Sequence, residues 1–219
     1  MSAITAPTAA RGGGSEGGQD GPPPHDSGEG GAPDRTVVVG YGFWIFILSD
    51  IIMFAALFAA FSVLSGSTAG GPAARQLLSL TSAKYETAVL LTSSFTCGLA
   101  ALALGRGATG QMQVWLVATL VLGATFLVLE LSEFGDLIAE GTGPDRNASL
   151  SSFFGLVGCH GAHVAFGLLW LILLMAHFAA KGCRPELVRR LLCFSIFWHA
   201  LDIVWVAILT NVYLMGAGR

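Results

Sequence analysis

The sequence predicts an all-α integral membrane protein, a bundle of five transmembrane helices. Hydrophobic residues make up 53% of the 219 residues, and charged residues only 11%. Soluble domains carry roughly twice this charged fraction, and the mean hydropathy here is +0.68. The apolar runs are about 20 residues or longer, enough at 1.5 Å per residue to cross the hydrocarbon core of a bilayer.

Loops that contain Gly and Pro separate the apolar runs and set the expected helix ends. We expect helices at about Val38–Leu64, Thr87–Leu104, Val114–Leu131 (with a possible extension to Ile138), Ser152–Ala180 and Leu191–Met215. The first opens with aromatic residues typical of a membrane interface. The sequence lacks the ten-residue segments of alternating polarity that a transmembrane β-barrel requires, so a barrel is excluded.

Residues 1–35 have a different composition from the rest of the chain. Gly dominates the stretch from Gly12 to Gly31, which contains Pro22-Pro23-Pro24 and almost no large apolar side chain. Such a segment buries too little surface to offset its conformational entropy. We expect a disordered cytoplasmic tail over 1–35, with no cleaved signal peptide, and one transmembrane domain over 36–219.

The distribution of Lys and Arg predicts the orientation. Seven of these residues fall on the side that holds the N-terminal tail, and four on the other side. Cytoplasmic loops carry the excess of positive charge. We therefore expect a cytoplasmic N-terminus and a periplasmic C-terminus in a bacterial inner membrane. The net charge of −3 gives no basic footprint for nucleic acid.

Ionisable side chains at membrane depth are the candidate functional residues, because each costs at least a few kcal/mol there. They are Glu86, Glu130, Glu133, His160, His163, His199 and Asp202. We expect them to form a structural polar network or a lipid cleft, with Asp202 bonded to Glu133 or His163. A proton-linked role for Glu130 and Glu133 stays open.

Two metal-binding alternatives are disfavoured. A di-iron site built from Glu86, Glu130, Glu133, His160 and His163 lacks the Glu-x-x-His pairs that such bundles use. Haem ligation by His160, His163 or His199 needs space that the neighbouring bulky side chains do not leave. We expect each of these histidines to bond a carboxylate or a backbone carbonyl.

Small residues on the fourth helix suggest a packing face. Gly155, Gly158, Ala162 and Ala165 fall on one side of that helix. Small side chains allow close helix contact in a membrane, where lipid provides no hydrophobic drive between helices. We expect the fourth helix to pack through this stripe.

Several motifs in order resemble subunit III of the haem–copper respiratory oxidases, over about residues 36–219. Gly42–Asp50 is similar to the first-helix motif of the five-helix, quinol-oxidase form, and Leu131–Phe134 to the SEY/SEF segment. Phe153–His163 resembles the FFxxxGxHGxHV block, Phe197–Trp205 the WHxxDxVW block, and Tyr213–Gly216 the usual C-terminus. The chain length, sufficient for five helices, resembles that of subunit III in the cytochrome-bo-type ubiquinol oxidase.

The resemblance implies a non-redox subunit of a proton-pumping terminal oxidase that reduces O2 to water. Haem and copper would then lie in the partner subunit I, and none in this chain. The implied roles are to stabilise subunit I, to form a lipid-filled cleft for membrane phospholipid and to support proton uptake. Glu86, Glu133, His160, His163, His199 and Asp202 match polar positions of the family, and none is expected to be catalytic.

Three alternatives remain open at this stage. An accessory subunit of a nitric oxide reductase and a subunit III of a cytochrome c oxidase would share much of the pattern. A stand-alone transporter would be expected to show inverted repeats and broken helices, and the five spans show no internal similarity.

Deletion of residues 2–33 is expected to leave assembly and oxidase activity unchanged, because a Gly- and Pro-rich coil contributes no packed surface. Co-purification with the partner subunits measures assembly. Loss of the partners from the truncated protein would instead identify the tail as a docking element.

Overall fold

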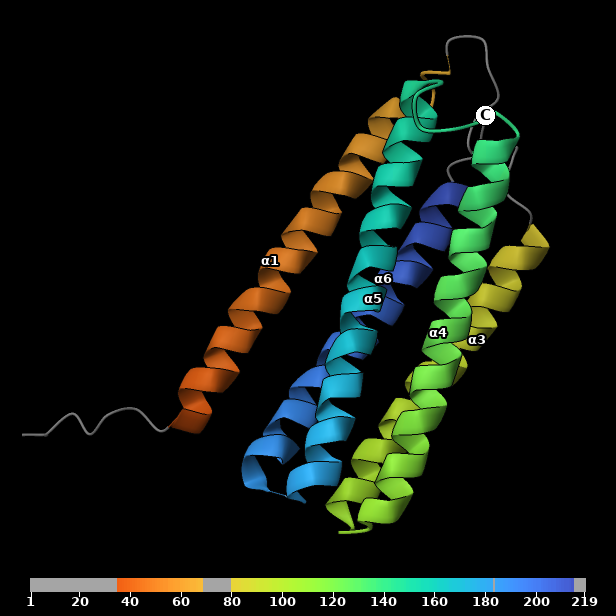
Figure 1. The fold of residues 1–219 in the computed structure, drawn as a ribbon. Helices are drawn as coiled ribbons and strands as arrows, with labels where there is room; N and C mark the ends of the chain where they lie inside the picture. The colour runs from red at the N-terminus through yellow and green to blue at the C-terminus, as the bar shows by residue number, and fades with distance from the viewer. Residues whose placement is uncertain (1–34, 69–79, 183, 215–219) are drawn as a thin grey trace, which may run out of the picture.

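The computed structural model describes residues 35–68, 80–182 and 184–214. They form five long helices: α1 (Arg35–Leu64), α3 (Leu80–Gly105), α4 (Thr109–Ala139), α5 (Ala148–Lys181) and α6 (Pro185–Leu214) (Figure 1). All five are long and apolar enough to cross a membrane, so the predicted all-helical, five-span fold is confirmed. The predicted tail lies almost wholly outside the described residues.

The helices extend beyond the apolar runs that predicted them. α3 begins before Thr87, α4 begins before Val114 and reaches Ala139, and α6 begins at Pro185. Hydropathy marks only the part of a helix that suits lipid, whereas backbone hydrogen bonding continues into polar flanks. The actual ends carry local signals: the Asn147 side chain accepts a hydrogen bond from the Leu150 amide at the start of α5.

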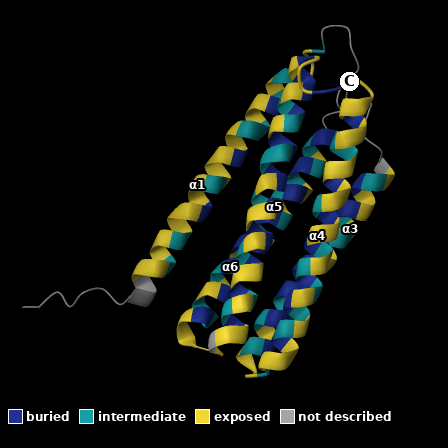
Figure 2. Ribbon diagram, viewed as in Figure 1, coloured by how far each residue is buried: buried dark blue, intermediate teal, exposed yellow. Residues whose placement is uncertain are grey.

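Four helices form the bundle, and α1 lies at its side. α3 and α4 pair as an antiparallel hairpin, α6 contacts both α3 and α5, and α1 packs against α5 and α6. Figure 1 shows α1 close to α5 near the start of α5 and diverging from it toward Arg35. Most of the α1 surface is exposed (Figure 2), so this helix offers the most surface to lipid or a partner.

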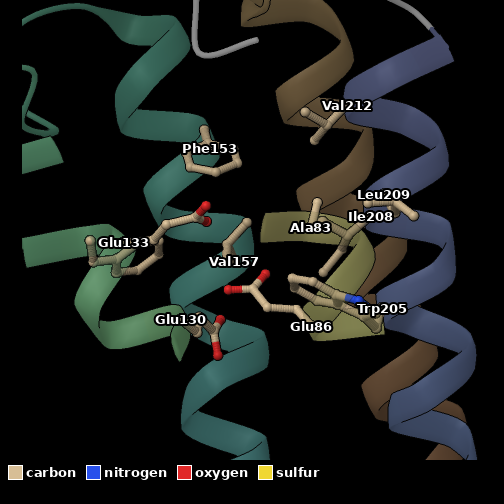
Figure 3. Close-up of a pocket in the computed structure, with 11 residues that line it drawn as sticks. Ala83, Glu86, Glu130, Glu133, Phe153, Val157, Trp205, Ile208, Leu209 and Val212 are labelled. Carbon is tan, nitrogen blue, oxygen red and sulfur yellow. The ribbon is translucent and has the colours of Figure 1, made fainter. Parts of the chain in front are cut away.

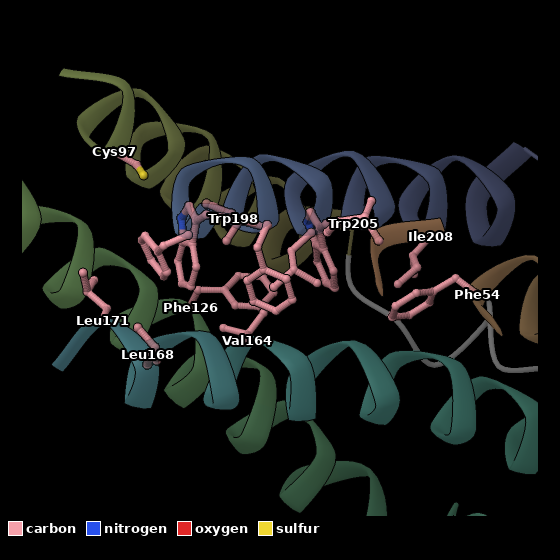
Figure 4. Packing of buried hydrophobic residues seen from close by; sticks show 14 of the residues in the cluster. Phe54, Cys97, Phe126, Val164, Leu168, Leu171, Trp198, Trp205 and Ile208 are labelled. Atoms are coloured by element: carbon pink, nitrogen blue, oxygen red, sulfur yellow. The ribbon is translucent and has the colours of Figure 1, made fainter. Parts of the chain in front are cut away.

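Aromatic side chains fill the core between the helices (Figure 4). Phe126, Phe194, Phe197 and Trp198 are each at most 1% exposed. The Trp198 ring stacks on the Phe194 ring at an interplanar angle of 29°, with the ring centroids 5.5 Å apart. Van der Waals packing of this kind, rather than a hydrophobic drive between helices, holds membrane bundles together.

Hydrogen bonds between helices supplement this packing. Trp198 Nε1 on α6 donates to Ser93 Oγ on α3 at 3.1 Å, and Ser93 Oγ donates to the Thr119 carbonyl on α4 at 3.3 Å. Trp205 Nε1 donates to Thr87 Oγ1 at 3.1 Å. Such bonds average about 0.6 kcal/mol in membrane proteins, so they fix the helix register more than they add stability.

Trp198 also explains two close contacts at glycines. A Cβ atom at Gly123 of α4 would lie 2.8 Å from Trp198 Cζ2, and one at Gly167 of α5 would lie 3.0 Å from Trp198 Cζ3. The indole therefore occupies space that only glycine leaves free on both neighbouring helices.

The predicted packing stripe of α5 is wrong for contacts within this chain. A Cβ at Gly155 would have nothing within 4 Å, and one at Gly158 would make only an ordinary contact with Phe134 at 3.7 Å. Ala162 and Ala165 are exposed. The sequence shows where small residues lie, but the large side chain that needs the space comes from another helix.

Gly123→Ala and Gly167→Ala are expected to destabilise the protein by about 1–3 kcal/mol, the usual cost of overpacking a tight core. Gly155→Ala is the matched control in open space, and it should be neutral or slightly stabilising because Ala favours helix. Thermal unfolding of the purified complex in detergent measures the difference. Equal melting temperatures for all three variants would contradict this assignment.

Candidate functional site

Three carboxyl groups meet in a cavity inside the bundle (Figure 3). Glu86 comes from α3, and Glu130 and Glu133 come from adjacent turns of α4. Figure 3 shows Glu86 and Glu133 extending toward each other, with Glu130 below them on the next turn of α4. The remaining lining is apolar or aromatic: Ala83, Phe134, Phe153, Val157, Trp205, Ile208, Leu209 and Val212.

The two inner carboxyl groups are almost completely buried. Glu86 is 2% exposed and Glu130 is 4% exposed, whereas Glu133 is half-buried. Within the described residues, Glu86 Oε1 and both oxygens of Glu130 have no hydrogen-bond partner. Ser82 is a polar neighbour of Glu133. Buried polar atoms without partners are rare in proteins, so these oxygens make the cavity the candidate functional site.

A glycine on α5 makes room for the deepest carboxyl group. A Cβ atom at Gly161 would lie 2.9 Å from Glu130 Oε2 and 3.0 Å from Glu130 Oε1. Gly161 belongs to the His160-Gly161-Ala162-His163 motif. The same motif therefore provides the space for the Glu130 carboxyl group and two membrane-depth histidines.

His160 is a fully buried core histidine, with 0% exposure. Its ring lies 5.7 Å from Phe126 and 5.2 Å from Trp205 between centroids, and Nε2 is 3.3 Å from the Leu201 carbonyl. Trp205 also lines the carboxylate cavity. His160 therefore packs behind Trp205, which lines the cavity, and connects α5 to α6 through its contact with the Leu201 carbonyl.

His163 faces a different neighbour, α1. Its Nδ1 is 2.8 Å from the Cys159 carbonyl, and its Nε2 is 3.8 Å from Asp50 Oδ1. Phe54 of α1 contacts the same ring edge-on, with centroids 5.3 Å apart. Asp50 was not among the predicted site residues. Its position near the middle of an apolar helix was the signal, but the sequence could not name its partner.

The predicted partner of Asp202 is wrong. Its polar neighbours are Ser94 of α3 and His199, one turn away on α6, and not Glu133 or His163. Asp202 is half-buried. His199 is exposed, and its Nδ1 is 2.7 Å from the Ser195 carbonyl. The seven predicted polar residues thus form separate groups: the three glutamates with His160 behind Trp205, His163 with Asp50, and Asp202 with His199.

Each of the three predicted histidines has one ring nitrogen in contact with a backbone carbonyl. Among the described residues, no three His, Cys, Asp or Glu side chains are spaced to hold a metal ion. The five residues of the di-iron alternative are divided between the carboxylate cavity and the contact with α1.

Residues 30–217 match the sequence profile of cytochrome c oxidase subunit III. This match covers most of the chain. The chain belongs to the cytochrome c oxidase subunit III family. The resemblance seen in the sequence motifs is therefore confirmed. As a subunit III, the chain is a component of a membrane-bound oxidase complex and associates with other oxidase subunits.

Similar subunit III proteins are found in several bacteria. The chain is 49% identical over 193 residues to the cytochrome bo(3) ubiquinol oxidase subunit 3 of Pseudomonas aeruginosa, which covers 88% of each chain. It is 41% identical to the quinol oxidase subunit 3 of Bacillus spizizenii, over 81% of this chain and 87% of that one. It is 42% identical to the cytochrome c oxidase subunit 3 of Bacillus sp. PS3, over 84% and 92%.

A double-mutant cycle tests the contact between α1 and α5. Asp50→Ala and His163→Ala are expected to show a coupling of about 0.5–1 kcal/mol, because the two groups are close and only partly screened. Unfolding of the purified subunit by detergent titration gives the free energies. The pair Asp50→Ala and His199→Ala is the control and should be additive. Additivity for Asp50 with His163 as well would show that the contact does not hold α1.

Proposed function

We propose that this chain is the non-redox subunit III of a proton-pumping ubiquinol oxidase in a bacterial inner membrane. In this proposal it stabilises the partner subunit I, which carries the haem and copper centres. The chain itself binds membrane lipid and transfers no electrons. Its N-terminus lies in the cytoplasm and its C-terminus in the periplasm.

The choice of ubiquinol as donor rests on the relatives. The chain is more similar to the Pseudomonas aeruginosa ubiquinol oxidase subunit, at 49% identity, than to the Bacillus sp. PS3 cytochrome c oxidase subunit, at 42%. The relatives named above are all oxidase subunits, and they do not favour a nitric oxide reductase.

The described part of the chain favours a subunit that stabilises the complex over one that carries a redox centre. One ring nitrogen of each membrane-depth histidine contacts a backbone carbonyl, and no three His, Cys, Asp or Glu side chains among the described residues are spaced to hold a metal ion.

An open cavity between α1 and α5 supports the proposal of lipid binding. It is lined by apolar and aromatic side chains: Phe43, Phe46, Phe166, Leu169, Trp170 and Leu173. α1 diverges from α5 along this side (Figure 1). Acyl chains of phospholipid match such a lining. The cleft proposed here is thus apolar, and the three glutamates lie in a separate cavity.

Purification through a tag on this chain tests the function. The complex is expected to show haem bands in its reduced-minus-oxidised spectrum and to oxidise ubiquinol with consumption of O2, while reduced cytochrome c serves as the control donor. Oxidation of cytochrome c and not of ubiquinol would identify the alternative, a cytochrome c oxidase.

Removal of this chain from the purified complex tests its supporting role. The haem and copper content of the remaining subunits should stay unchanged, because this chain supplies no ligand to them. Activity should start near the wild-type level and decline faster during turnover. An immediate loss of haem or copper in proportion to the removed chain would contradict the proposal.

A further inference from the structure

The carboxylate cavity has a property that a purely supporting subunit does not need. Three acidic side chains converge in it, two of them at 2% and 4% exposure. No Lys, Arg or His is among the residues that line the cavity. Within the described residues, the buried oxygens of Glu86 and Glu130 also lack hydrogen-bond donors. Something that these described side chains do not supply must compensate the charge.

Carboxyl groups buried near one another in an apolar site cannot all ionise, so at least one of them holds a proton. A metal ion is the other possible counter-charge, but the described acidic groups are not spaced to hold one. A proton needs only one carboxyl oxygen. The arrangement therefore favours a proton over a cation.

We propose that Glu86, Glu130 and Glu133 form a proton-holding site, in which at least one carboxyl group carries an exchangeable proton that reaches water through Glu133. Glu133 is the half-buried member of the three and has a polar neighbour in Ser82. When the proton leaves, it passes from a carboxyl group to water at Glu133, and a carboxylate remains in the cavity. Return of a proton from water reverses the step.

The surroundings define which groups influence this site. On α4, Asp136 follows Glu133 and is exposed. On α5 the lining residues are Phe153 and Val157, and the titratable His160 contacts the Leu201 carbonyl. α6 contributes only Trp205, Ile208, Leu209 and Val212. On α3, Lys84 and Tyr85 are exposed and do not line the cavity.

Gly161 acts as a positioning residue for this site. Because a Cβ there would meet both oxygens of Glu130 at 2.9 and 3.0 Å, the absence of a side chain allows the carboxyl group to lie against α5. A methyl group would push Glu130 toward the cavity and change the environment of the proton held there without removing any carboxyl group.

Infrared difference spectroscopy of the purified complex between neutral and alkaline buffer tests the proposal. The wild-type complex is expected to lose a carbonyl band of a protonated carboxyl group as the pH rises, and the band should shift to lower frequency in D2O. Glu86→Gln, Glu130→Gln and Glu133→Gln should each remove or shift this band. Glu140→Gln, at an exposed position beyond the cavity, is the matched control and should leave it unchanged.

Variants that keep all three carboxyl groups cover the case in which a glutamine variant does not assemble. Gly161→Ala is expected to shift the band, and Gly155→Ala, in open space on the same helix, is expected to leave it in place. Absence of the band in the wild type, or an identical band in every cavity variant, would overturn the proposal. A stoichiometric metal ion that is lost in Glu130→Gln would overturn it in favour of a cation site.

Discussion

The position of the Trp198 side chain is the constraint on which the bundle depends. The indole of this α6 residue lies against Gly123 of α4 and Gly167 of α5, and its Nε1 donates to Ser93 of α3. A single side chain therefore contacts the three other helices of the bundle. In a bilayer, where apolar surface is equally well solvated by lipid, such shape-dependent contacts determine how helices associate.

This arrangement also positions the polar groups. Trp205 lies two turns after Trp198 on α6, donates to Thr87 of α3 and contacts the buried His160 ring of α5. It forms one wall of the cavity that contains the glutamates. The register of α6 against α3 and α5 is thus the same register that encloses the carboxyl groups, so core packing and the candidate site are not independent.

The helices divide the ionisable residues between two environments. Glu86 and Glu130 lie inside the four-helix bundle, where the neighbouring helices exclude lipid and water. Asp50 and His163 instead meet where α1 packs against α5, at 19% and 21% side-chain exposure. This subunit III thus combines an internal cavity with carboxyl groups and a polar contact between its most exposed helix and the bundle.

The sequence by itself determined the five spans, the family and three ionisable residues that prove to be buried, Glu86, Glu130 and His160. These follow from one-dimensional properties: the length of the apolar runs, the cost of a charge at membrane depth, and motifs of fixed spacing such as His160-Gly161-Ala162-His163.

Only the tertiary structure decided which residues meet. The glycines that matter for packing are Gly123, Gly161 and Gly167, because Trp198 and Glu130 reach them from other helices, whereas the small stripe through Gly155 faces outward. His163 pairs with Asp50 rather than with Asp202. Helical periodicity shows which residues share a face, but rotation of each helix about its axis selects the neighbour, and that rotation depends on side chains far apart in the sequence.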